Sequence, residues 1–199
     1  MIRVHTSIST PTGLAELRDL VESDIEAIVR YWFGSGDAHL DFLGIDRRLL
    51  GNEDDTRRRF RIAIRSGDHD QSHIAFAITL DGTFAGYTLL NRYDPENNYS
   101  HWHITDPRRR ATGISTALYP WRIKTYFDSA PIARLIHQTR TRNIAVNRML
   151  DKFVPVAETA WIESPDGIAQ PGEFHLRYVR RADVPRLFEI CALQRSMTR

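Results

Sequence analysis

Two apolar, β-prone stretches separated by a single turn constrain the fold of this chain more than any other feature. They cover residues 72–80 and 84–91, and Asp81-Gly82 stands between them. Asp-Gly at such a place favours a tight hairpin, because both residues tolerate positive φ angles. The sequence therefore predicts an antiparallel pair of strands near the middle of the chain, followed by a third strand at residues 99–105.

The remaining residues alternate between helical and extended spacing of their apolar side chains. Helical spacing occurs at residues 25–32, 53–65, 114–127, where Pro120 is a candidate kink, and 144–153. Extended spacing occurs at residues 14–20, 133–139, 156–162 and 173–179. Residues 34–44 contain three glycines and indicate a turn-rich connection. The resulting order, β-α-α-β-β-β-α-β-α-β-β, predicts an α/β fold.

Composition indicates one soluble domain over residues 1–199. Of the 199 residues, 42% are hydrophobic and 26% are charged, as in ordinary globular proteins. Helical spacing behind Asp183 predicts that residues 183–199 form a C-terminal helical extension, docked on its own domain or on the partner subunit of a homodimer. No apolar run approaches the ~18 residues of a membrane span, and no signal peptide is evident. We therefore expect a cytoplasmic protein with no membrane partner.

Arginine supplies 25 of the 27 basic residues. Two interpretations stay open, since guanidinium groups suit phosphate recognition and a GC-rich genome also favours arginine codons. The 25 acidic residues leave a net charge of only +2, so whole-chain charge does not indicate nucleic acid. Cys191 is the single cysteine, which excludes an intrachain disulfide and a cysteine cluster, and we expect no bound metal.

The junction between the strand at residues 99–105 and the helix that begins near Ile114 carries the strongest functional signal. A basic turn rich in small residues joins the two elements. Free backbone N–H groups and the helix dipole converge at such a junction. Arg108, Arg109 and Arg110 add bidentate donors for phosphate oxygens. The sequence therefore predicts a phosphate-binding site here.

This junction resembles the signature of the GCN5-related N-acetyltransferase (GNAT) superfamily, Gln/Arg-x-x-Gly-x-Gly/Ala. The matching residues are Arg110-Ala111-Thr112-Gly113-Ile114-Ser115, with Ser115 where Gly or Ala is usual. The helix that follows Asn143 is similar to the Asn-led fourth helix of the family. Within the superfamily, His101-Trp102-His103 resembles an uncharacterised bacterial branch with a His-x-His strand. The resemblance implies a GNAT fold, with a mixed central sheet of about seven strands flanked by helices.

The resemblance also implies the donor and the residues that hold it. The donor would be acetyl-CoA or another acyl-CoA, with its pyrophosphate at the loop and its pantetheine arm beside the strand end and the Asn-led helix. The residues that this places at the donor are Ile104, Thr105, Asp106, Arg108, Arg109, Arg110, Ala111, Thr112, Gly113, Ile114, Ser115, Asn143 and Asn147.

Two histidines are the candidate catalytic residues. Aminolysis of a thioester needs a base that deprotonates the amine, and histidine has a pKa suited to that task. His101 and His103 share one face of the strand because its period is two. His101 is the first candidate, since its distance from the loop is similar to that of the second histidine in serotonin N-acetyltransferase-like enzymes. A purely structural role for both histidines stays open.

The general acid is unassigned. Many GNAT enzymes have a tyrosine as the general acid where this chain has Leu150. Tyr119 or Tyr126 could take its place as the acid, although burial habits of tyrosine favour a packing role for both. The resemblance further places residues 37–46 over the acceptor. The candidate acceptor-binding residues are Trp32, Asp37, His39 and Asp41.

Three functions follow as alternatives. The first is transfer of an acetyl or other acyl group from acyl-CoA to an amine of a small molecule or peptide. The second keeps the fold but takes the acyl group from aminoacyl-tRNA, which would suit the arginine content and the relaxed loop. The third is a module that binds acyl-CoA or a protein without catalysis, as Leu150 and Ser115 would allow. Donor binding and release of free thiol distinguish them.

Overall fold

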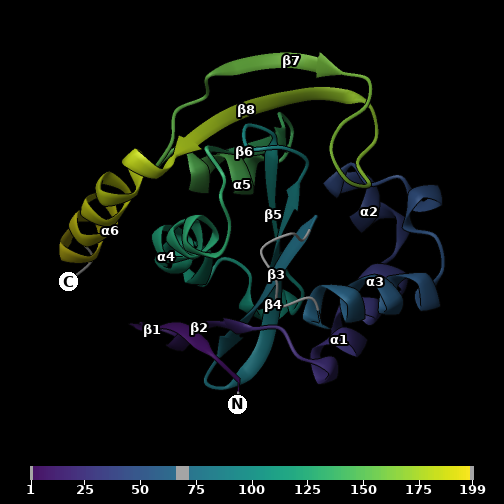
Figure 1. The fold of residues 1–199 in the computed structure, drawn as a ribbon, viewed down its shortest axis with the longest axis horizontal. Helices are drawn as coiled ribbons and strands as arrows, with labels where there is room; N and C mark the ends of the chain where they lie inside the picture. Colours follow the sequence, from purple (N-terminus) through teal and green to yellow (C-terminus); the bar gives the residue numbers. More distant parts are fainter. Residues whose placement is uncertain (1, 66–71, 198–199) are drawn as a thin grey trace.

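An eight-stranded sheet forms the centre of the molecule (Figure 1). The computed structural model describes residues 2–65 and 72–197. The strands are β1 (Val4–Thr10), β2 (Gly13–Asp19), β3 (His73–Leu80), β4 (Thr83–Arg92), β5 (Asn98–Ile104), β6 (Arg134–Arg140), β7 (Glu158–Ile162) and β8 (Gly172–Arg180). The helices are α1 (Glu22–Phe33), α2 (Asp37–Leu43), α3 (Glu53–Arg65), α4 (Ile114–Ser129), α5 (Ile144–Leu150) and α6 (Val184–Met197).

The strand order is β1-β2-β3-β4-β5-β6-β8-β7, and every neighbouring pair is antiparallel except β5 and β6. The sheet is therefore mixed, as a GNAT fold requires. The predicted hairpin is confirmed, since β3 and β4 meet at Asp81 and Gly82, whose φ angles are 50° and 73°. Both angles lie in the left-handed region that Asp-Gly turns adopt.

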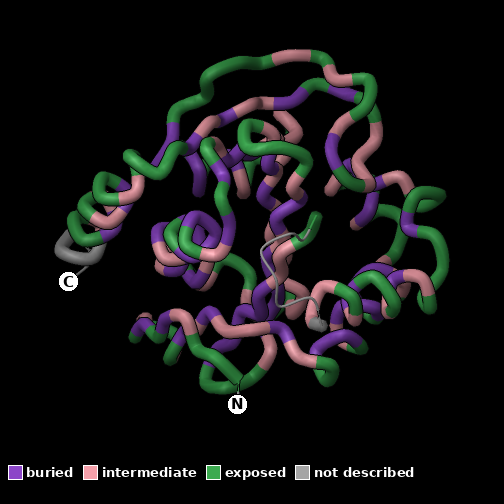
Figure 2. Tube along the Cα trace, in the orientation of Figure 1, coloured by how far each residue is buried: buried purple, intermediate pink, exposed green. Residues whose placement is uncertain are grey.

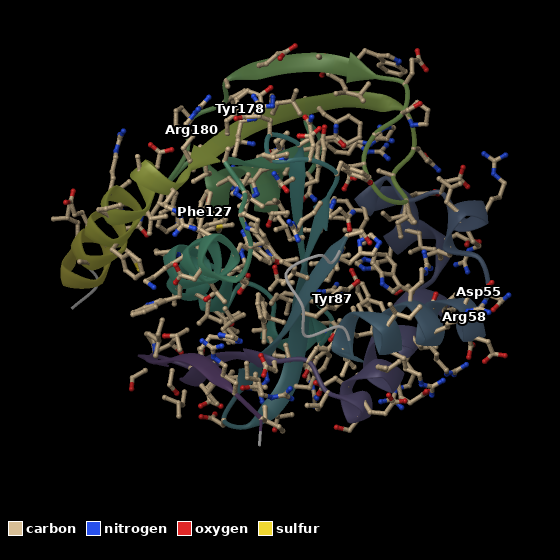
Figure 3. All side chains as sticks on the ribbon, viewed as in Figure 1. Asp55, Arg58, Tyr87, Phe127, Tyr178 and Arg180 are labelled. Carbon is tan, nitrogen blue, oxygen red and sulfur yellow. The ribbon has the colours of Figure 1, made fainter. Side chains whose placement is uncertain are left out.

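Two hydrophobic cores lie on opposite faces of this sheet, so that buried positions follow the central strands (Figure 2). One core packs α4, α5 and α6 against the sheet, and the other packs α1, α2 and α3 against it. Figure 3 labels Phe127 on the α4 side and Tyr87 on the side of α3. Side chains that alternate along β4 and β5 therefore enter different environments.

The structure differs from the sequence prediction at three short elements. β1 was not expected, because residues 4–10 are polar and alternate only weakly, and the strand forms by pairing with β2. Residues 37–43 form α2 instead of a turn-rich connection, since burial of Leu40, 2% exposed, compensates for the flanking glycines. α5 ends at Leu150 rather than Phe153. The sheet accordingly has eight strands where about seven were expected.

Helix α6, which covers residues 184–197 of the expected C-terminal extension, packs on its own chain. Leu187 and Cys191 of α6 are buried in the α4 core, and Trp121 and Phe188 make an edge-to-face contact at 4.7 Å. This contact covers the apolar face of α6. None of the described helices is long and apolar enough to cross a membrane.

Candidate functional site

A cavity of about 330 Å³ lies on the sheet face that α1 and α3 cover. Strands β4, β5 and β6 form its floor, and the loop between β7 and β8 closes one side with residues 166–169. Its volume is at the small end of the roughly 300 to 1,000 Å³ of small-molecule sites. The cavity therefore suits a compact ligand.

The floor of the cavity is where β5 and β6 separate. The described ladder between these parallel strands consists of Tyr99 opposite Ile136. His101 and Gln138 would be the next pair in register, yet the loop residue Asp166 joins them instead. Its carboxylate contacts His101, and its backbone N–H donates to Oε1 of Gln138 at 2.7 Å. Both divergent strands thus present side chains to the cavity.

His101 is paired with a buried carboxylate. Its Nε2 lies 2.5 Å from Oδ2 of Asp166, whose side chain is 2% exposed. Asn91 donates to Oδ2 at 2.8 Å, and Tyr93 donates to Oδ1 at 2.7 Å. Burial raises the pKa of Asp166, but these hydrogen bonds, first that of His101, more than offset it and leave the pKa below its ordinary value.

An ionised Asp166 fixes the tautomer of His101. A carboxylate can only accept, so the proton of the neutral imidazole resides on Nε2. The lone pair is then on Nδ1. This is the arrangement of a histidine base oriented by an acid.

His103 lies in a different environment, although it shares the face of β5 with His101 as predicted. The rings of Trp32 and Tyr87 lie 4.7 and 5.1 Å from its centroid, and the Tyr31 hydroxyl lies 3.5 Å from Nδ1. Burial, followed by repulsion from His101, lowers the pKa of His103 to about 3. The expectation that either histidine has a pKa suited to a base is therefore wrong for His103.

The predicted phosphate loop has the backbone of an anion site. Ala111 and Gly113 have φ angles of 59° and 83°, and Gly113 is the N-cap of the 16-residue helix α4. The first intrahelical bond runs from the Ala117 N–H to the Gly113 carbonyl at 2.9 Å. The N–H groups before it have no acceptor within the helix. A Cβ built at Gly113 meets no atom within 4 Å, so the described chain leaves space beside this turn.

The basic run is only partly available to a ligand. Arg108 folds back on Asp106, with Nε and Nη2 each 3.0 Å from a carboxylate oxygen. Asp106 also caps the short 3-10 helix η2 (Pro107–Arg109). Nε of Arg110 donates to the Ile104 carbonyl at 3.1 Å, and Arg110 lines a second groove beside α1. Arg109 approaches Asp106 at 3.9 Å.

No protein-family model and no curated protein sequence matches this chain. Solved structures do resemble it. Mycobacterium smegmatis RimJ in complex with CoA-disulfide has a TM-score of 0.69 and 18% identity, covering 95% of this chain and 94% of RimJ. The aminoglycoside acetyltransferase AAC(6')-Ib in complex with coenzyme A has a TM-score of 0.65 and 14% identity, covering 86% of this chain and 98% of AAC(6')-Ib. The microcin C7 self-immunity acetyltransferase MccE, in complex with acetyl-CoA and AMP, has a TM-score of 0.63 and 15% identity, covering 86% of this chain and 97% of MccE. The chain has the GNAT acetyltransferase fold.

Within this GNAT fold, the two asparagines assigned to the donor differ. Asn143 caps α5, and its Oδ1 accepts from the Val146 N–H at 3.4 Å. The Asn147 side chain is fully used inside the protein. Its Oδ1 accepts from Thr139 and Arg177, and its Nδ2 donates to the carbonyls of residues 140 and 141. Asn147 therefore braces β6 against α5, and its polar atoms are not free for a donor.

The two tyrosines considered as general acids lie on the α4 side of the sheet, away from the cavity. The Tyr119 hydroxyl lies 2.9 Å from Nε2 of His137, and the Tyr126 hydroxyl lies 2.6 Å from the Thr88 hydroxyl. Burial raises the pKa of both phenols. Leu150 is fully buried as well. These contacts favour packing roles, and the GNAT general acid stays unassigned.

The four acceptor-binding candidates are divided by the structure. Trp32 lines the cavity and donates from Nε1 to the Tyr87 hydroxyl at 2.8 Å. His39 lines the second groove, where burial and then Arg110 lower its pKa. Asp37 is exposed and paired with Arg47 at 2.8 Å. Asp37 and Asp41 line neither space.

Sequence reasoning missed most of the polar residues around the cavity. Asp166, Asn91 and Tyr93 are brought together only by folding, and Arg59 and Arg140 enter from α3 and β6. The one available signal was spacing, since Arg140 and Gln138 share a face of β6 by its period of two. No comparable signal marks Asp166, because it lies in an irregular loop.

Proposed function

We propose that this protein is an N-acyltransferase that moves an acetyl or other acyl group from acyl-CoA to an amine of a small molecule or peptide. The observation that carries the proposal is the His101–Asp166 pair, which faces a cavity at the divergence of β5 and β6. The likeness to acetyltransferases crystallised with CoA or acetyl-CoA supports acyl-CoA as the donor.

His101 supplies the base in this proposal. The acceptor arrives as an ammonium ion, gives one proton to His101 and attacks the thioester carbonyl with its freed electron pair. The C–N bond forms, the C–S bond breaks, and the second proton of the nitrogen passes to the leaving sulfur, which departs as the free thiol. Asp166 stabilises the imidazolium and holds its orientation. His103, neutral and enclosed by aromatic rings, acts as a wall of the site.

The turn before α4 fits the pyrophosphate of the donor. Gly113 leaves open space at the helix start, and the N–H groups of the first turn offer donors to an anion. CoA would supply the activated thioester, and the turn would fix its position relative to His101. Arg110, which borders the second groove, is the arginine that we propose binds a phosphate oxygen of the donor.

The test offers the protein acetyl-CoA and a panel of amines while free thiol is measured. Amine-dependent thiol release that is lost in His101→Ala would support the proposal. Binding of CoA by calorimetry without thiol release from any amine would favour the non-catalytic module. Transfer only from aminoacyl-tRNA, detected by mass spectrometry of the product, would favour the alternative donor.

A further inference from the structure

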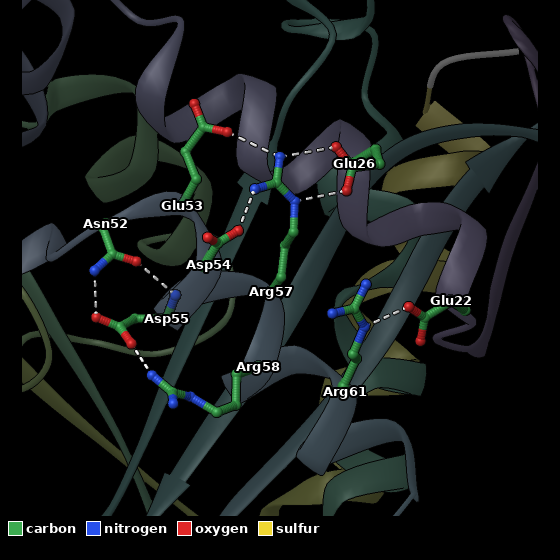
Figure 4. A network of polar contacts seen from close by, with 9 residues as sticks. All are labelled: Glu22, Glu26, Asn52, Glu53, Asp54, Asp55, Arg57, Arg58 and Arg61. Carbon is green, nitrogen blue, oxygen red and sulfur yellow. Dashed lines mark hydrogen bonds and ion pairs between the residues drawn. The ribbon is translucent and has the colours of Figure 1, made fainter.

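Four of the arginines of α3 divide into two groups by their partners, namely Arg57, Arg58, Arg59 and Arg61. Figure 4 shows Arg57 and Arg61 paired with Glu26 and Glu22 of the neighbouring helix α1, and Arg58 paired with Asp55 of α3 itself. Arg57 alone contacts Glu26, Glu53 and Asp54 within 3.0 Å. Their charges are compensated within the described chain.

Arg59 is the exception among these four, because it lines the cavity and makes no ion pair with any described residue. Its Nη2 donates to the Leu50 carbonyl at 3.2 Å and to the Thr56 hydroxyl at 3.1 Å. These two neutral acceptors orient the guanidinium without neutralising it. Nε and Nη1 are left for a ligand.

Arg140 brings a second uncompensated cation to the same cavity. Its guanidinium lies 5.0 Å over the Phe174 ring, and Nη2 donates to the Gln170 carbonyl at 2.9 Å. Its Nε is buried and has no hydrogen-bond partner among the described residues. A side chain at Gly44 or Gly172 would collide with this guanidinium, so the absence of a Cβ at both positions leaves room for the Arg140 side chain. A cation held this way without an anion is costly unless a ligand supplies one.

No carboxylate among the described lining residues of the cavity is free to compensate the charges of Arg59 and Arg140. Asp166 is the one carboxylate among its described lining residues, and three donors already occupy that carboxylate. The rest of the lining is largely apolar, including Ile45, Phe60 and Leu89. Charge and volume together select a small ligand with an apolar body and a negative group.

We propose that the acceptor is a small, amino-acid-like amine whose anionic group binds Arg59 and Arg140 while its amine lies at His101. This inference rests on the proposed acyl transfer and names the substrate class of that site. Polyamines such as spermidine would be rejected, because the cavity already holds two uncompensated cations. A guanidinium recognises a carboxylate through parallel N–H···O bonds.

The experiment compares each L-amino acid with its C-terminal amide, since the pair differs at the anionic group alone. Binding by calorimetry and acetyl transfer from acetyl-CoA are measured for wild type, Arg59→Gln, Arg140→Gln and the control Arg58→Gln. The preferred carboxylate should bind roughly 10- to 100-fold better than its amide, and Arg59→Gln or Arg140→Gln should remove that preference. Arg58→Gln should keep it.

The outcomes separate this inference from the proposed function. If no carboxylate binds better than its amide in wild type, the inference is overturned whatever the turnover. If carboxylates bind with the expected Arg59 dependence but no acetyl transfer occurs, the anion site stands and acyl transfer fails. Arg59 is exposed, so its variant is expected to fold and keeps the test decisive if Arg140→Gln does not.

Discussion

Asp166 lies 2.5 Å from Nε2 of His101, although 65 positions separate the two residues in the chain. The pair joins a strand at the middle of the sheet to a loop at its far edge. It also distinguishes His101 from His103, which is two residues away and has no carboxylate partner in the described chain. Three of the following predictions concern the two histidines and this carboxylate.

His101→Ala should lower kcat/KM by roughly 10² to 10⁴, because a general base contributes about that factor. CoA affinity should be retained, since the donor loop is a separate element. The rate should recover partly as pH rises, because more of the acceptor is then deprotonated in solution. Steady-state kinetics with a verified acceptor would measure this. Wild-type rates in both His101→Ala and His103→Ala would make the histidines structural.

Asp166→Asn should reduce kcat roughly 10- to 100-fold, because the amide keeps the shape but cannot stabilise the imidazolium. KM for acetyl-CoA should hardly change. Asp128→Asn is the matched control, since Asp128 is exposed and lines neither space. A wild-type kcat in Asp166→Asn, or a loss confined to KM, would contradict a positioning role for Asp166.

Gly113→Asp should weaken CoA binding, because it places a negative charge where the pyrophosphate is proposed to lie. The φ angle of 83° makes any side chain strained, so Gly113→Asn is the control for shape without charge. Calorimetry should show lower CoA affinity for Asp than for Asn. Equal affinity of Gly113→Asp and wild type, in a folded protein, would place the donor elsewhere.

His103 should make the fold sensitive to acid. Its pKa of about 3 lies below the ordinary 6.5, so between these values the unfolded chain binds a proton that the folded chain does not. Stability is therefore lost as pH falls through this window, by up to about 1.4 kcal/mol per pH unit. His103→Phe should flatten the slope of Tm against pH in part, because buried His137 also has a lowered pKa. An NMR titration in which the wild-type His103 ring protonates near pH 6.5 would contradict this prediction.

Leu187→Ala in α6 should reduce the free energy of unfolding by about 2 to 5 kcal/mol, because the leucine is 1% exposed in the α4 core. Arg186→Ala, at an exposed neighbouring position, is the control and should have little effect. Chemical denaturation measures both. Equal stability of the two variants would mean that α6 is not bound to α4 in solution.

The sequence was informative where local chemistry decides the structure. The Asp81-Gly82 turn, the alternation that aligns His101 with His103, and the apolar stripe of α6 all follow from neighbours within a few residues. The same holds for the turn at Gly113, where a strand gives way to a helix. These features supplied the fold class and one catalytic candidate.

Tertiary contacts decided the rest. β1 becomes a strand by pairing with β2, and α2 becomes a helix by burying Leu40. The low pKa of His103 arises from α1 residues such as Trp32, about 70 positions earlier in the chain, which no spacing rule connects to it. The resemblance places Asn147 at the donor, whereas its bonds to Thr139 and Arg177 form only when β6, α5 and β8 come together on folding.

The position of Asp166 between the last two strands has a consequence for protein synthesis. A ribosome makes the chain from the N-terminus, so His101 emerges long before its carboxylate partner. β8, which follows Asp166, must also pair with β6 before the loop can settle beside His101. A nascent or truncated chain that stops before residue 166 would have the histidine without its orienting acid, so the base proposed here would be complete only after residue 166 and β8 have been synthesised.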